Sequence, residues 1–270
     1  MATIATKQLG SGAVIPVIGL GTWQCRAGEH AYIAVLNALK LGYRHIDTAQ
    51  MYGNERDVGR AITESGLSRG EVFVTSKYYT ASWDYDQVVS AVKQSVERIG
   101  GGYVDLYLLH TAGNASKRAD AWRALEDMQD EGLVRDIGVS NFTEAHLKKL
   151  SETWRVKPAV NQIELHPWLT RTELVAFCEG EGIHLEAYSP LAQASKWSDR
   201  VVRSVAKEVD ATPAQVLIAW SVAKGFIPIP KSADRTRQKE NLEAYNIQLS
   251  EGQIQRLDAL EEDFVTGWRI

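Results

Sequence analysis

The sequence has little cysteine, little net charge and no long apolar run, and each shortage excludes a class of protein. Its two cysteines, Cys25 and Cys178, form no C-x-x-C motif, so neither a disulfide framework nor a cysteine-based zinc site is expected. A formal net charge of −4 over 270 residues provides no overall field to attract nucleic acid or an anionic membrane. Nowhere do about 18 apolar residues run together, as a membrane-spanning helix requires.

The first residues also lack the basic segment and apolar core of a secretory signal. Together with the small number of cysteines, this makes a reducing cytoplasm the expected compartment. We expect a monomer whose partner is a small molecule, with neither nucleic acid nor a membrane as a partner.

Two further motifs are missing. No complete G-x-G-x-x-G follows an expected strand, and GLGTW at 19–23 has only the first two glycines, so a Rossmann domain is not supported. No segment rich in proline, glycine and serine divides the chain, and 44% apolar residues are enough for one large core. A single domain over residues 1–270 is therefore expected.

The chain does contain eight short β-rich runs that alternate with segments of helical periodicity. The runs lie at 17–20, 43–47, 72–77, 104–110, 134–140, 159–165, 184–190 and 226–230. Helical spacing is clearest at 31–41, 87–99, 119–130 and 174–181, and capping boxes begin at Thr212 and Ser250.

Eight such units predict a (β/α)8 TIM barrel, an α/β fold, with an open doubly wound sheet as the alternative. A hairpin that turns at 10–12 precedes the first unit and is expected to close the bottom of the barrel. Extra helices are expected near the C-terminus.

A barrel also predicts that chemically active side chains gather at the C-terminal ends of its strands, because those ends meet at one mouth. Polar residues occur at six of these ends. They are Asp47, Lys77, His110, the pair Ser140 and Asn141, Gln162, and the pair Tyr188 and Ser189.

Six ordered motifs resemble those of the aldo-keto reductases. They are GYRHIDTAQMYGNE at 42–55, VTSK at 74–77, VDLYLLH at 104–110, IGVSNF at 137–142, NQIELHP at 161–167 and IPKS at 229–232. Within that family the resemblance points to the branch of 2,5-diketo-D-gluconate reductase and prostaglandin F synthase. It implies reduction of aldehydes and ketones to alcohols, with a nicotinamide cofactor as the hydride donor.

The residues themselves suit this reaction, which needs a hydride at carbon and a proton at oxygen. A tyrosine with a pKa near 10 is a weak acid, and a nearby ammonium lowers that pKa. Lys77 is expected to act in this way on Tyr52, with Asp47 keeping the lysine charged and His110 orienting the carbonyl. The resemblance implies the same four catalytic roles.

Each of these four residues also has an ordinary explanation when taken singly. Asp47 fits a helix cap, Lys77 a solvated strand end, Tyr52 a surface aromatic and His110 a core histidine. Their joint position at the ends of successive barrel strands favours catalysis. No metal site is expected, because the histidines show no i,i+4 pairing, and His166 is interpreted as structural.

A basic cluster follows the eighth expected strand, where barrels often bind phosphate. A solvated charge run is the ordinary explanation, but the resemblance implies a site for NADPH, with NADH as the alternative cofactor. It assigns Lys231, Ser232 and Arg237 to the 2′-phosphate, and Glu240 and Asn241 to the adenine end. It further assigns the nicotinamide carboxamide to Ser140, Asn141 and Gln162, the ring to Tyr188, the pyrophosphate to Ser189 and Leu191, and the near wall to Gly21 and Thr22.

Several positions depart from the family pattern. Asp234 is expected to cap the following helix, although an aspartate facing the 2′-phosphate would weaken the preference for NADPH. Alanines at 192 and 194 replace the usual glycines, which predicts a stiffer loop over the pyrophosphate. Trp268 and Arg269 either fold back on the pocket, where Arg269 would favour anionic substrates, or belong to a frayed terminus.

The segment 110–117 lacks the tryptophan and proline that often follow the histidine, and Tyr79 replaces a common tryptophan, which predicts a wider and less aromatic pocket. Two other functions fit a barrel of this kind. One is a regulatory or redox-sensing subunit that binds the cofactor with little turnover, and the other is a lyase or isomerase that uses no nicotinamide. The complete set of four catalytic side chains favours a reductase.

Overall fold

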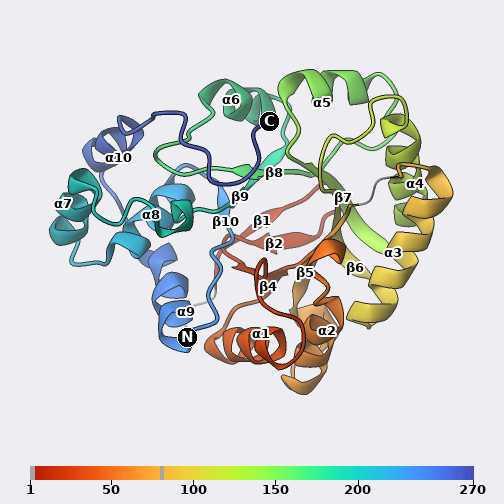
Figure 1. The fold of residues 1–270 in the computed structure, drawn as a ribbon, viewed down its shortest axis with the longest axis horizontal. Coiled ribbons are helices and arrows are strands. Elements are labelled where there is room, and N and C mark those ends of the chain that lie inside the picture. Colours follow the sequence, from red (N-terminus) through yellow and green to blue (C-terminus); the bar gives the residue numbers. More distant parts are fainter. Residues whose placement is uncertain (1–3, 80–81) are drawn as a thin grey trace.

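Eight parallel strands form one curved sheet with helices around it (Figure 1). This computed structural model describes residues 4–79 and 82–270. Each strand pairs with the next one along the chain. The strands are β3 Leu20–Gly21, β4 His45–Asp47, β5 Phe73–Tyr78, β6 Val104–Leu109, β7 Val134–Ser140, β8 Val160–Glu164, β9 His184–Tyr188 and β10 Ile227–Pro228.

Helices connect the strands in alternation. They are α1 Glu29–Leu41, α2 Glu55–Glu64, α3 Tyr85–Ile99, α4 Arg118–Asp130, α5 Glu144–Ser151, α6 Thr172–Gly180, α7 Arg200–Glu208, α8 Pro213–Ala223, α9 Arg235–Glu243 and α10 Glu251–Asp258. The expected extra helices are confirmed by α7 and α8, which both lie between β9 and β10, and by α10 after α9. None of the described helices is long and apolar enough to span a membrane.

The sheet closes on itself, which settles the choice between a barrel and an open sheet. The amide of Gly19 donates to Pro228 O at 3.0 Å and the amide of Gly21 to Pro230 O at 3.2 Å. A Cβ at Gly21 would lie 2.7 Å from Ile229 O, so glycine permits this close approach of the first and last strands. The regular β10 is shorter than the expected 226–230, in which Pro228 and Pro230 lack amide donors.

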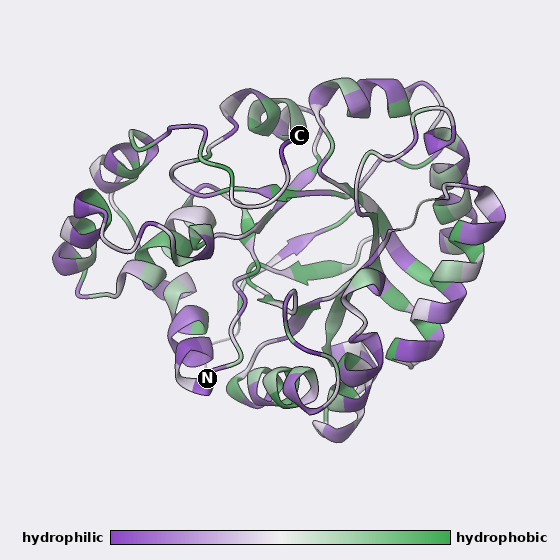
Figure 2. Cartoon of the chain, in the orientation of Figure 1, coloured by the Kyte–Doolittle hydropathy of each residue, from purple (hydrophilic) through white to green (hydrophobic). Residues whose placement is uncertain are grey.

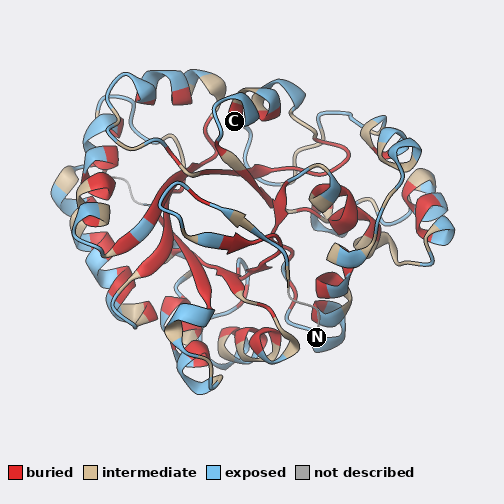
Figure 3. Cartoon of the chain, turned by 180° about the vertical axis from the view of Figure 1, so that it is seen from behind, coloured by how far each residue is buried: buried red, intermediate tan, exposed pale blue. Residues whose placement is uncertain are grey.

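The N-terminal hairpin, β1 Thr6–Gln8 and β2 Val14–Pro16, closes the bottom of the barrel as predicted. It binds residues near the N-terminal ends of strands: the Ser11 hydroxyl donates to Asp136 at 2.5 Å, and His184 Nε2 lies 3.0 Å from Gln8 O. Figure 3, seen from behind, shows the hairpin lying across this end. The open mouth is therefore the opposite end.

Side chains that point into the barrel form two layers of different polarity. Leu9 and Ile15 of the hairpin pack with Phe73, Leu106 and Val160 in an apolar layer at the bottom. Two or four residues further along the strands, the inward positions carry polar groups, all buried: Asp47, Thr75, Lys77, Gln162 and Glu186. Apolar residues on the outer face of the sheet pack under the helices, whose outer faces are hydrophilic (Figure 2).

Candidate active site

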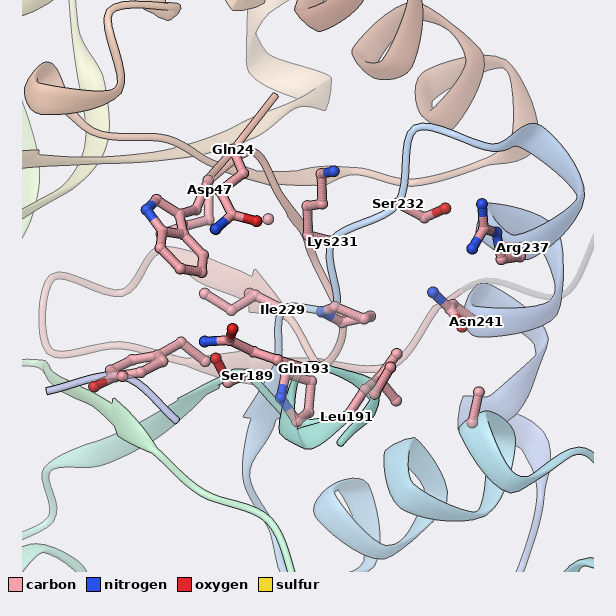
Figure 4. Close-up of a pocket in the computed structure, with 18 of the residues that line it drawn as sticks. Gln24, Asp47, Ser189, Leu191, Gln193, Ile229, Lys231, Ser232, Arg237 and Asn241 are labelled. Carbon is pink, nitrogen blue, oxygen red and sulfur yellow. The ribbon is translucent and has the colours of Figure 1, made fainter. Parts of the chain in front are cut away.

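A cavity of about 890 Å³ opens at the C-terminal ends of the strands. Figure 4 shows it as a long cleft, with Asp47 near one end and Ser232, Arg237 and Asn241 at the other. Its walls come from the loops after several strands, as the barrel predicts.

A buried ion pair lies beneath the Asp47 end of the cleft. Lys77 Nζ donates to Asp47 Oδ2 at 2.6 Å and to Thr48 O at 2.8 Å, and the lysine side chain is fully buried. Burial by itself raises the pKa of Asp47, and the Lys77 ammonium opposes that shift. The Lys77 ammonium therefore helps Asp47 to remain charged in the barrel interior.

Tyr52 lies above this pair on a single helical turn, Gln50–Tyr52. Lys77 Nζ is 5.1 Å from the centroid of the Tyr52 ring. Gly53 ends the turn in a left-handed conformation with φ 69°. The buried Asn54 then anchors the loop by accepting from the Thr48 hydroxyl at 2.6 Å.

The pKa of Tyr52 departs from the direction that the sequence predicts. Burial raises it well above the ordinary value, and the carboxylates of Asp47 and Glu186 add to the increase. The expected net lowering of this pKa by Lys77 is therefore not observed, because burial and the two carboxylates outweigh the nearby ammonium. The phenol stays protonated at neutral pH and is ready to donate.

His110 follows β6 and faces Tyr52, with the two ring centroids 5.8 Å apart. Burial lowers the pKa of His110 well below its ordinary value, and the Lys77 charge adds to this effect. The imidazole is therefore neutral, which suits it to hydrogen-bond a carbonyl oxygen rather than to supply a full charge.

Gln162 connects the ion pair to the cavity. Its Nε2 donates to Asp47 Oδ2 at 2.8 Å and to Glu186 Oε2 at 2.5 Å. No described residue donates to its Oε1, and Gln162 lines the cavity. The two carboxylates therefore fix this amide with its carbonyl oxygen as the free acceptor.

Ser140, Asn141 and Tyr188 lie beside Gln162 and hold one another. Asn141 Nδ2 donates to Ser140 Oγ at 3.0 Å and to His110 O at 3.1 Å, and its Oδ1 accepts from the Tyr188 hydroxyl at 2.9 Å. All three residues line the cavity. The structure thus brings together, at the base of the cleft, the three residues expected to bind the nicotinamide carboxamide, namely Ser140, Asn141 and Gln162.

The basic end of the cleft lies at the start of α9. Lys231 has no hydrogen-bond or ion-pair partner in the described part of the chain, and the Arg237 side chain is 73% exposed. Asp234 caps the helix, as predicted, by accepting from the Arg237 amide at 2.9 Å. The same carboxylate lies 3.9 Å from Arg237 Nε, an exposed ion pair of little strength, so both cations can still bind an anion.

Among the remaining cofactor candidates, Thr22 does not line the cavity. Its amide and its hydroxyl both donate to Asp47 O at 2.9 Å, and it is fully buried behind the wall. It therefore supports Asp47 rather than facing the cleft. The other candidates line the cavity, namely Gly21, Ser189, Leu191, Ser232, Glu240 and Asn241.

The loop after β9 carries more strain than the sequence suggests. Ser189, Ala192, Gln193 and Ala194 all have φ between 46° and 65°. These are left-handed conformations, which glycine adopts without steric cost and alanine does not. The alanines at 192 and 194 therefore hold this wall of the cleft in a strained shape.

Three buried residues that organise the site were not among the expected site residues. They are Asn54, Glu164 and Glu186, and all three have 2% or less exposure. Glu164 and Glu186 had a visible signal, since each is a charged residue inside an apolar strand. His166 has the structural role expected of it, with Nε2 3.2 Å from Glu164 Oε1.

The C-terminal segment folds back over the mouth (Figure 1), where Trp268 lines the cavity. Its ring centroid is 5.1 Å from that of His110 and 5.9 Å from that of Tyr79. Arg269 instead lies beside Asp263, at 3.5 Å, with 78% exposure. The mouth is therefore more aromatic than expected, and Arg269 adds no charge to it.

The ion pair predicts a non-additive effect on stability. Asp47→Asn or Lys77→Met each leaves a buried charge without its partner, which typically costs about 3–5 kcal/mol in the free energy of unfolding. The double variant Asp47→Asn/Lys77→Met buries neither charge and should lose less than the sum of the two. Urea unfolding of the four proteins measures this, and additive losses would show that the pair does not interact.

Known proteins share this architecture and these motifs. The model of the Aldo/keto reductase family matches residues 17–262. Glyoxal reductase of Bacillus subtilis (strain 168) is 42% identical over 258 residues, with 96% of this chain and 93% of the relative covered. The 9,11-endoperoxide prostaglandin H2 reductase of Trypanosoma cruzi (strain CL Brener) is 41% identical over 252 residues, with 92% and 89% covered.

Among solved structures, the Bombyx mori aldo-keto reductase in complex with NADP is 31% identical. It superposes with a TM-score of 0.91 and covers 98% of this chain and 95% of that one. Family match, relatives and fold agree over nearly the whole sequence. The chain therefore belongs to the aldo/keto reductase family and is an NAD(P)H-dependent oxidoreductase.

Proposed function

We propose that this enzyme reduces aldehydes and ketones to alcohols with NADPH, and that Tyr52 is the proton donor. The observation that carries the proposal is the convergence of four side chains at one end of the cleft: Asp47, Tyr52, Lys77 and His110. The other end of the same cleft presents cations to a phosphate. One elongated cofactor and one small carbonyl fit this division.

Tyr52 and His110 act on the carbonyl oxygen. The neutral imidazole donates a hydrogen bond that orients the oxygen, and the protonated phenol supplies the proton. Lys77 stabilises the phenolate that remains, since its ammonium lies 5.1 Å from the ring centroid. Asp47 holds that ammonium in place.

The residues present fit a dinucleotide. Bound NADPH supplies the hydride. Gln162 Oε1, fixed by two carboxylates, is an acceptor for a carboxamide N–H, and Tyr188 offers a flat ring on the cleft wall. Ser189 and Leu191 border the pyrophosphate region, and Glu240 and Asn241 the adenine region.

The preference for NADPH over NADH rests on Lys231, Ser232 and Arg237 at the far end of the cleft. These groups complement a 2′-phosphate, which NADH lacks. Asp234 caps the helix and also forms an exposed 3.9 Å ion pair with Arg237, with which a 2′-phosphate would compete. A monomeric state and a cytoplasmic location stay predictions.

Replacing Tyr52 by Phe removes the proton donor and leaves the ring in place. Turnover of an aldehyde should fall by at least about a hundredfold, as expected for loss of general acid catalysis. NADPH should still quench the fluorescence of Trp23 and Trp197, which line the cleft. Turnover within a few fold of the wild type would remove Tyr52 from its role.

Replacing Arg237 by Ala should raise the dissociation constant of NADPH by about ten- to a hundredfold, the usual value of a charge-assisted hydrogen bond. The dissociation constant of NADH should hardly change. Arg235→Ala is the matched control, because Arg235 lies on the same helix but does not line the cleft. Equal weakening of both cofactors would contradict a 2′-phosphate site.

A further inference from the structure

One buried carboxylate, Glu164, holds the C-terminal segment over the mouth of the barrel. Glu164 ends β8 and is fully buried. Its Oε1 accepts from the Thr266 amide at 2.8 Å and from the Thr266 hydroxyl, and its Oε2 accepts from the Gly267 amide at 2.9 Å. His166 Nε2 approaches Oε1 from the other side at 3.2 Å.

These contacts require an ionised carboxylate. Although burial opposes it, the hydrogen bonds from His166, Thr266 and Gly267 hold the pKa of Glu164 below its ordinary value. An amide in its place would present hydrogen atoms towards some of these donors. A carboxylate at this position therefore accepts from the segment in a way that glutamine cannot.

The C-terminal segment packs so closely that position 267 has little room for a side chain. A Cβ on Gly267 would lie 3.0 Å from Tyr188 Cε2 and 3.2 Å from Glu164 Oε2. Thr266 O also accepts from Gln193 Nε2, at 3.0 Å, in the loop beside the cofactor cleft. Residues 266 and 267 therefore contact β8, Tyr188 and that loop.

The next residue after this clamp is Trp268, and it completes an aromatic wall. Tyr79, His110 and Trp268 lie pairwise within 5.1–5.9 Å between ring centroids. The interplanar angle between Tyr79 and Trp268 is 29°, a stacked arrangement. The wall is uncharged, since His110 is neutral and Arg269 does not line the cleft.

We propose that Glu164 is a positioning residue for substrate specificity: by clamping residues 266 and 267 it sets Trp268 against His110 and gives the enzyme its preference for uncharged, planar carbonyl compounds. The proposal rests on carbonyl reduction as the proposed function. Glu164 acts through Trp268 and does not touch the reacting atoms. A flat conjugated group gains from stacking on the wall, whereas a puckered ring of the same size does not.

The test compares benzaldehyde with cyclohexanecarbaldehyde, two neutral aldehydes whose six-membered rings differ in planarity. The ratio of their kcat/KM values is measured for the wild type, Trp268→Ala, Glu164→Gln and the double variant. Glu126→Gln is the matched control, because Glu126 is also buried and accepts two backbone amides, those of Arg155 and Val156, away from the cleft.

Trp268→Ala should lower the ratio of kcat/KM for benzaldehyde to that for cyclohexanecarbaldehyde by about three- to tenfold, the usual contribution of an aromatic pair. Most of this change should be an increase in the KM of benzaldehyde. Glu164→Gln should lower the ratio to the same extent, and the double variant should lower it no further, since both changes remove one contact. The control should keep the wild-type ratio even if it melts earlier.

A second measurement does not depend on turnover. Hydrogen exchange of the amides of Thr266 and Gly267 should speed up in Glu164→Gln and not in Glu126→Gln. Thr266→Val tests the same contact with the carboxylate intact, should Glu164→Gln fail to fold. It should lower the ratio and speed up exchange at Gly267.

Two results would overturn the proposal: an unchanged substrate ratio in Glu164→Gln, or a further drop in the double variant. Unchanged exchange at Gly267 would overturn the clamp itself. A wild type that oxidises NADPH with neither aldehyde would instead refute the proposed function, and the exchange experiment would still decide on the clamp.

Discussion

The ion pair between Lys77 and Asp47 is the constraint on which the rest of the site depends, because neither charge is tolerable alone in the barrel interior. It fixes which side chains of the neighbouring strands β4 and β5 point into the barrel, at the level where polar inward residues replace apolar ones. Gln162 extends the pair to Glu186 by donating to both carboxylates. Tyr52 and His110 lie above this network of buried charges. The network cannot rearrange without leaving a buried charge unpaired.

The two-layered interior explains how one barrel provides both stability and chemistry. The apolar layer and the N-terminal hairpin seal the bottom, so the polar layer opens towards the mouth only. Above that layer, burial acts on the two titratable groups in opposite directions: it raises the pKa of Tyr52 and lowers that of His110. Both groups are neutral as a result, one as a proton donor and the other as a hydrogen-bonding partner of the oxygen.

Much of this could be predicted from the sequence, because β-α alternation and polar strand ends are local patterns. Asp47, Lys77 and His110 were located by their place at the ends of strands. The position of Thr22 behind the wall of the cleft and the role of Glu164 were not predicted, and the sequence left open whether the C-terminal segment folds back on the pocket. These depend on contacts between distant segments, such as 164 with 266, which no local pattern encodes. The upward shift of the Tyr52 pKa likewise depends on burial and on carboxylates that include Glu186.

The most direct test of the account is the turnover number of Lys77→Met at saturating NADPH and aldehyde, with cofactor binding checked by tryptophan quenching. If the paired ammonium stabilises the phenolate that Tyr52 becomes on donating its proton, turnover of Lys77→Met should fall by about a hundredfold or more. Its NADPH dissociation constant should stay within about twofold of the wild-type value. A turnover number close to that of the wild type would contradict the central role of the ion pair.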